Sequence, residues 1–199
     1  MHKSGVLIFK NAGQVIPTDI LDKVVKDFGK SSGWALAAKE EGEEYSQISS
    51  QQYASTVVRD KFDEFHLQVM DFPVSFYFGK ETKNVEHVQP FLLVKSPDGQ
   101  PAMVGFFLGD FVGYADKDKN HTPEYNVAKH VSGWLQRVFD ETEGDLEALR
   151  THIQQASFKA EIEKLYSKEG TILLLDADGE VFTFGNESID QHDWGWHTS

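Results

Sequence analysis

Residues 4–38 read SGVLIFKNAGQVIPTDILDKVVKDFGKSSGWALAA, and this stretch decides the fold. Residues 6–9 are an unbroken run of Val, Leu, Ile and Phe, which is typical of a strand buried on both faces. Residues 11–13 predict a turn, after which Val15 and Ile16 would return as a partner strand. A helix is expected from Thr18, a candidate N-cap, to Gly29. A second apolar strand would follow at Trp34–Ala38.

This order of elements, with Ile16-Pro17 before the helix and Gly33-Trp34-Ala35-Leu36-Ala37 in the second strand, resembles a known family. It is similar to the start of a class II glutamine amidotransferase-like domain of the N-terminal-nucleophile (Ntn) hydrolase fold, in its short phage form. The resemblance returns at Leu108-Gly109, where the family has an Asn-Gly pair, and in the Trp-rich tail from Trp194. It implies an α+β fold, a four-layer αββα sandwich of mostly antiparallel sheets, in one amidotransferase-like domain over residues 1–199.

The second half of the chain carries clear local signals. Residues 126–139 form an amphipathic pattern, and Thr122 before Pro123 is the expected N-cap of that helix. Residues 145–166 predict a further helical stretch with a break near Gln155. Residues 171–176 and 180–185 flank an Asp-Gly turn and predict a β-hairpin.

The stretch between the two halves is less regular. Residues 39–50 are polar and acidic and predict a hairpin turn or a loop at the surface, and residues 51–60 are expected to be a short helix or a strand, of which we favour the helix. Residues 61–70 place their apolar side chains at helical spacing.

Composition excludes several function classes. The chain of 199 residues has a formal charge of −13, so direct binding to nucleic acid is not expected. No apolar run is long enough for a membrane span, and the first residues show no signal-peptide pattern. With no cysteine, a cytoplasmic location is expected, in the host cell if the protein is phage-encoded. The acidic charge indicates either simple solubility, which we favour, or a basic partner surface.

Three positions at which the resemblance implies catalytic groups do not carry them. The family's nucleophilic Cys is replaced by Gly5, or by Ser4 with a shift of one residue. Leu108 stands at the Asn of the oxyanion hole, beside Gly109. Tyr77 aligns with the Arg that binds the substrate carboxylate, and a phenol cannot form that bidentate pair. The pattern predicts a relative without catalytic residues, a pseudoenzyme.

Two alternatives remain open. Ser4 would become an N-terminal nucleophile if the chain were cleaved after Lys3, which would give an active amidohydrolase or glutamine amidotransferase. Alternatively, the protein is a structural component of a virion. The sequence leaves open the oligomeric state and the identity of a partner.

An aromatic cluster supplies the candidate binding residues. The resemblance implies that these segments rim the former substrate cleft, where the side chains would either fill the cleft or anchor a protein partner, host or viral. The residues are Phe106, Phe107, Phe111, Tyr114, Trp194 and Trp196.

No cofactor or metal is expected. Residues 116–127 begin like a calcium loop but have His121 and Val127 where Gly and Glu are needed. The eight His residues show no metal-ligand spacing, and His130 is interpreted as a core or subsurface residue. We therefore expect a catalytically inactive, phage-encoded amidotransferase-like protein that binds another protein, with a host-directed inhibitory role as one form of that function.

Overall fold

The computed structural model describes residues 5–28, 32–38, 46–53, 74–79, 87, 89–185 and 189–198. The chain divides into two compact units, Met1–Pro90 with Ser188–Ser199 and Phe91–Glu187. In the described part of each unit there is one sheet, and all strand pairings among these residues are antiparallel.

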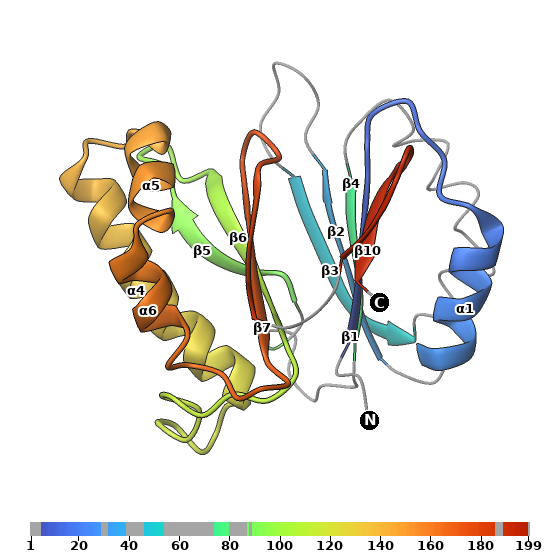
Figure 1. The fold of residues 1–199 in the computed structure, drawn as a ribbon, viewed down its shortest axis with the longest axis horizontal. Coiled ribbons are helices and arrows are strands. Elements are labelled where there is room, and N and C mark those ends of the chain that lie inside the picture. Colours follow the sequence, from blue (N-terminus) through green and yellow to red (C-terminus); the bar gives the residue numbers. More distant parts are fainter. Residues whose placement is uncertain are drawn as a thin grey trace. The chain divides into compact units, whose positions relative to one another are not determined.

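The first unit is built on a six-stranded sheet of order β3-β2-β4-β1-β10-β9. Its members are β1 (Gly5–Lys10), β2 (Ser32–Ala38), β3 (Ser46–Tyr53), β4 (Val74–Gly79), β9 (Ile189–His192) and β10 (Gly195–Thr198), and the described part of this unit also contains helix α1 (Thr18–Phe28). The apolar β1 is buried along its whole length between β4 and β10, as its unbroken hydrophobic run predicts. The C-terminal segment thus completes the sheet begun by the N-terminal strand (Figure 1).

The second unit packs three helices on one face of a four-stranded sheet of order β5-β6-β7-β8 (Figure 1). Its elements are β5 (Phe91–Lys95), β6 (Pro101–Leu108), α4 (Pro123–Glu141), α5 (Leu146–Ile153), α6 (Ala156–Ile162), β7 (Thr171–Asp176) and β8 (Val181–Gly185). Side chains of the sheet and of all three helices form one buried core, which includes Phe107, Val131, Leu149 and Phe158. No helix of the described residues is long and apolar enough to cross a membrane.

Several predicted elements are confirmed. The hairpin of β7 and β8 turns at Asp178-Gly179, and Thr122 caps α4 by accepting the Tyr125 N–H at 3.3 Å. The predicted break near Gln155 separates α5 from α6. A polar residue that accepts a backbone N–H fixes where a helix begins, so these local signals were sufficient.

Two predictions in the first unit were wrong. Val15 and Ile16 form no strand, and Ile16 is buried where the chain approaches α1. Residues 46–53 form β3 beside β2, where we predicted a turn or loop up to residue 50 and favoured a helix over a strand from residue 51. Their polar side chains give no apolar alternation, so only pairing with β2 reveals the strand. The helix predicted at 61–70 lies outside the described residues.

Candidate functional site

The positions of the expected catalytic groups lie in or beside strands. Gly5 is the first residue of β1 and is paired with Gly79, while Ser4 lies outside the described residues. Tyr77 lies in the middle of β4, opposite Leu7 of β1 and Ala35 of β2. The sheet therefore places the two aligned positions, Gly5 and Tyr77, on neighbouring strands.

Leu108 and Gly109 occupy the end of β6, where the resemblance aligns the oxyanion-hole pair. The Leu108 side chain is 1% exposed and its residue is paired with Thr171. Gly109 has a φ of +86°, and a Cβ atom there would lie 1.8 Å from the Glu169 carbonyl oxygen. The backbone thus requires glycine at position 109 for packing. A Leu side chain provides no hydrogen-bond donor, whereas an oxyanion hole is built from donors.

The predicted aromatic binding residues divide by exposure. Phe106, Phe107 and Phe111 are buried, Phe107 and Phe111 within the core of the second unit, while Tyr114 is 46% exposed. Buried rings cannot anchor a partner, so the predicted surface does not include the three Phe side chains. Phe106 and Phe107 lie in β6, where every residue from Ala102 to Leu108 is buried.

The two tail tryptophans also differ. Trp196 is buried and stacks on Phe9 with ring centroids 5.6 Å apart. Trp194 is half-buried and stacks on His192 at 4.8 Å. Only Trp194 therefore presents part of its ring at the surface.

The β9–β10 pairing also creates a polar chain that the sequence spacing did not reveal. The His192 Nε2 atom lies 3.0 Å from His197 Nδ1, and His197 Nε2 lies 3.6 Å from the Asp190 carboxylate. Among the described residues, no group of three or more His, Cys, Asp or Glu side chains could hold a metal ion. These polar contacts join β9 to β10.

A groove of about 1000 Å³ lies in the second unit and is the candidate functional site. We call it the α4 groove, because α4 provides its longest wall. It is lined by Gly113, Tyr114, Lys117, Asp118, His121, Asn126, Lys129, His130, Gly133, Trp134, Arg137, Glu161, Lys164 and Leu165.

The loop wall of the α4 groove is held in place by Asn126. This buried side chain donates from Nδ2 to the Ala115 and Asp118 carbonyl oxygens, both at 2.8 Å. Asp118 in turn accepts the Asn120 N–H at 2.9 Å and lies 3.6 Å from His121. One asparagine of α4 therefore holds the loop at two points, the Ala115 carbonyl oxygen and the Asp118 carbonyl oxygen, which also accepts the His121 N–H at 3.2 Å.

The other end of the loop is fixed to the end of α6. The Val112 N–H donates to the Leu165 carbonyl oxygen at 2.9 Å, and a Cβ atom on Gly113 would lie 2.9 Å from the Lys164 carbonyl oxygen. This close backbone approach brings α6 beside the loop and makes a second wall of the groove.

Tyr114 and His130 form an aromatic platform in the groove. Their rings stack with centroids 3.6 Å apart at 13°, and Lys117 Nζ lies 5.5 Å from the Tyr114 centroid. Tyr114 has a φ of 60°, a conformation that few non-glycine residues adopt. Burial, and secondarily the Lys117 cation, lower the pKa of His130 below its ordinary value. The platform is therefore an uncharged stack beside cations at neutral pH.

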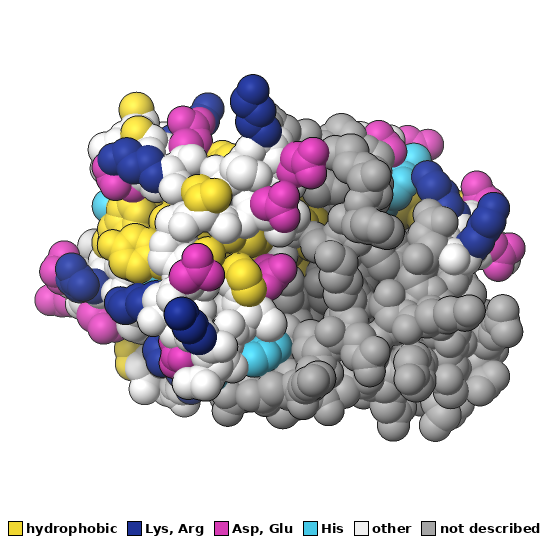
Figure 2. All heavy atoms as spheres, turned by 90° about the horizontal axis from the view of Figure 1, so that it is seen from below, with side chains coloured by type: hydrophobic (Ala, Val, Ile, Leu, Met, Phe, Trp, Pro, Cys, Tyr) yellow, Lys and Arg dark blue, Asp and Glu magenta, His cyan; other side chains and the backbone are white. Residues whose placement is uncertain are grey.

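The groove differs in charge from the chain as a whole. Four cations, Lys117, Lys129, Arg137 and Lys164, face two carboxylates, Asp118 and Glu161, which gives a formal +2. The whole chain has a formal charge of −13. Figure 2 shows Lys and Arg side chains between Asp and Glu on one face of the molecule, with hydrophobic side chains exposed among them.

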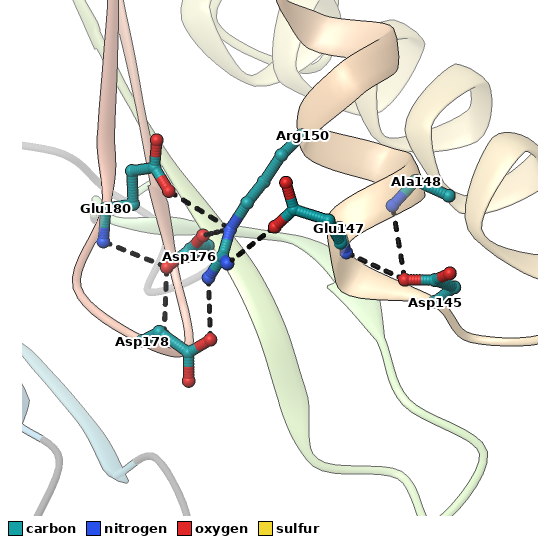
Figure 3. A network of polar contacts seen from close by, with 7 residues as sticks. All are labelled: Asp145, Glu147, Ala148, Arg150, Asp176, Asp178 and Glu180. Atoms are coloured by element: carbon teal, nitrogen blue, oxygen red, sulfur yellow. Dashed lines mark hydrogen bonds and ion pairs between the residues drawn. The ribbon is translucent and has the colours of Figure 1, made fainter.

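Arg150 of α5 binds the turn of the β7–β8 hairpin (Figure 3). Its Nε lies 2.7 Å from Asp176 and its Nη2 lies 2.6 Å from Asp178, with Glu180 at 3.2 Å from Nε and Glu147 at 3.2 Å from Nη1. The hydrogen bond to Asp176 raises the pKa of the guanidinium above its ordinary value. The network fixes α5 to the sheet and lies outside the α4 groove.

Of the residues that line the groove, the sequence predicted Tyr114 as a binding residue, whereas His130 was interpreted as a core or subsurface residue and the cations were not predicted. Lys129, Gly133 and Arg137 recur every four residues, so they lie along one side of a helix. That spacing could have predicted two cations on one side of the helix. The loop and α6 walls gave none, because their contact with α4 depends on the tertiary fold.

Comparison with known proteins identifies the fold. No protein-family model matches the chain, and no curated protein does. Among solved structures, the chain is similar to the glutamine phosphoribosylpyrophosphate (PRPP) amidotransferase from B. subtilis in complex with ADP and GMP, with a TM-score of 0.54 and 16% identity. The similarity covers 98% of this chain and 41% of that one, so the chain spans less than half of the enzyme's length.

That enzyme is a class II glutamine amidotransferase of the Ntn type. The α+β prediction with antiparallel sheets is confirmed by the two sheets, and the likeness supports the Ntn-like sandwich. At this level of identity the similarity concerns the fold alone.

Proposed function

We propose that this protein is a catalytically inactive member of the amidotransferase fold, formed as one domain, that acts by binding another protein. The observation that carries the proposal is the burial of Leu108 at the aligned oxyanion position. Loss of one oxyanion-hole donor costs roughly 2.7–4 kcal/mol of transition-state stabilisation. The chain also has no cysteine, so the family's thiol nucleophile is absent from the sequence.

The partner is proposed to be a host protein met in the host cytoplasm, with the chain encoded by a phage. The formal charge of −13 favours a partner whose surface is mainly basic, because complementary potentials steer association. Binding alone would inhibit that host protein, so this function needs no catalytic residue in the chain.

The absence of catalysis is tested with purified protein, by measuring glutamate released from glutamine and by recording the intact mass of the same sample. We expect no release above a heat-inactivated control and an N-terminus that retains residues 1–3. The matched variant is Ser4→Ala, which removes the remaining candidate nucleophile. Glutamate release by wild type that is lost in Ser4→Ala would refute the proposal.

Binding is tested by affinity capture from host lysate, followed by reconstitution of the complex from two purified proteins. A partner that binds in a fixed ratio supports the proposal. Recovery only with assembled virions would instead support a structural role in the particle.

A further inference from the structure

The cations of the α4 groove are arranged along its length. Lys129 and Arg137 are two helical turns apart on the same side of α4. Lys117 lies in the loop wall and Lys164 near the end of α6. From Asn126 to Arg137 the helix rises about 16 Å, a length that about five residues of extended chain would span.

Three of these four cations form no direct ion pair with a described residue. Among the described residues, no carboxylate lies within 4.0 Å of the charged nitrogens of Lys117, Lys129 or Arg137. Lys164 forms an exposed ion pair with Glu161, and such pairs contribute little. The groove therefore has cations that can pair with carboxylates of another molecule.

Apolar contact area lies beside these cations. Tyr114 is 46% exposed, its neighbour Val112 is 63% exposed, and Trp134 is half-buried in the groove wall. Tyr, Trp and Arg are the residue types that most often dominate the binding energy of protein interfaces. The loop that carries Tyr114 is already fixed by Asn126, so little ordering is needed on binding.

We propose that the α4 groove binds a short, extended acidic segment of the partner protein. Carboxylates of the segment pair with Lys117, Lys129 and Arg137, and an apolar side chain packs on Tyr114 and Trp134. The inference rests on the proposed binding function and specifies one part of it. A partner with a basic surface and one acidic segment would complement both the acidic surface of this protein and its positively charged groove. Because the acidic segment pairs only with the groove, this pairing fixes the orientation of the complex.

A short acidic segment fits the groove better than a nucleic acid does. The two cations of α4, Lys129 and Arg137, are about 12 Å apart along the helix, and a longer polyanion would continue onto a chain whose formal charge is −13. Nucleic-acid binding gains its affinity from many phosphate contacts along a continuous basic surface.

The test measures fluorescence anisotropy of a fluorescein-labelled peptide of about eight residues, in which Asp and Glu surround a central Leu. A peptide with Asn and Gln in place of the acids, and a single-stranded DNA of similar length, are measured in parallel. We expect the acidic peptide to bind at least about tenfold more tightly than either, and more weakly at high salt.

Charge reversal locates the site on the protein. Lys129→Glu with Arg137→Glu should weaken acidic-peptide binding by at least about tenfold. Lys159→Glu, on the exposed side of α6 and outside the groove, makes the same kind of charge change and should alter binding by less than about twofold. Tyr114→Ala should also weaken binding, and circular dichroism confirms that each variant is folded.

Equal losses in the groove and control variants, tighter binding of DNA, or no binding of the acidic peptide would each overturn the inference. Glutaminase activity of the wild-type protein would refute the proposed function without affecting this peptide result. The two proposals can therefore fail separately.

Discussion

The Arg150 guanidinium donates from Nε to the Oδ2 atom of Asp176 at 2.7 Å, and the Asp176 side chain is fully buried. The other carboxylate oxygen of Asp176 accepts the backbone N–H groups of Asp178 and Glu180, both at 2.9 Å. A single buried carboxylate thus closes the β7–β8 turn and binds α5 to it. This explains why the short α5, of eight residues, keeps a fixed place on the sheet.

Replacement of Arg150 should destabilise the protein strongly. In Arg150→Met the aliphatic part of the side chain remains, but Asp176 becomes a buried charge without its cation, which costs about 3–5 kcal/mol. The free energy of unfolding, measured by urea denaturation, gives the effect. The control is Glu147→Gln at the exposed end of the same network, where the side chain is 76% exposed, and a change within about 0.5 kcal/mol is expected. Equal effects of the two variants would contradict the assignment.

Glycine at position 109 is required by packing as well as by conformation. Gly109→Ala would place a Cβ atom 1.8 Å from the Glu169 carbonyl oxygen at a φ of +86°. We expect a loss of more than about 3 kcal/mol in unfolding free energy, from overpacking and backbone strain together. Gly99→Ala is the matched control, because its φ is +87° and nothing lies within 4 Å. That control should cost about 1 kcal/mol, and similar losses at both sites would show that the clash is relieved.

Removal of the Asn126 amide should release the loop of the α4 groove. Asn126→Ala removes the side-chain donor to the Ala115 carbonyl oxygen and one of the two donors to the Asp118 carbonyl oxygen, which costs about 1–3 kcal/mol. Trypsin should then cleave after Lys117 faster than in the wild type. Lys119→Ala, an exposed change in the same loop, should keep the wild-type stability and the wild-type rate of cleavage after Lys117. A loop that stays protected in Asn126→Ala would mean that α6 alone holds it.

Stability should fall in mild acid because of His130. Its pKa is lowered in the folded state, first by burial and then by Lys117, so the unfolded chain binds a proton more readily. The stabilisation is present above the unfolded pKa of about 6.5 and is lost as the pH falls through the lower folded pKa. Urea denaturation from pH 8 to pH 5 measures this loss.

The control for this titration is His130→Phe, which retains a ring against Tyr114 and cannot be protonated. The stability of wild type relative to this variant should decrease below about pH 6.5. An NMR titration that gives His130 a pKa at or above its ordinary value would contradict the prediction.

The sequence predicted elements whose signals are local. Thr122 and Pro123 mark the start of α4, and Asp178-Gly179 marks the turn of the last hairpin, because capping and turn formation depend on residues a few positions apart. The unbroken apolar run in β1 predicted a buried strand, because this signal also lies in neighbouring residues of the sequence. By contrast, β3 has polar side chains, and only its pairing with β2 makes it a strand.

The site follows the same division. By itself, the sequence determined the α+β fold class and the absence of cysteine, and it predicted Leu108 at the aligned oxyanion position. The tertiary structure decided that Phe106, Phe107 and Phe111 are buried, and Phe107 and Phe111 lie in the core that the three helices form with the sheet. It also decided that Lys117, Lys129, Arg137 and Lys164 share one groove, because the backbone contacts at Leu165 and the Asn126 amide bring three separate segments together. Contacts between residues so far apart in the chain leave no periodic pattern in the sequence.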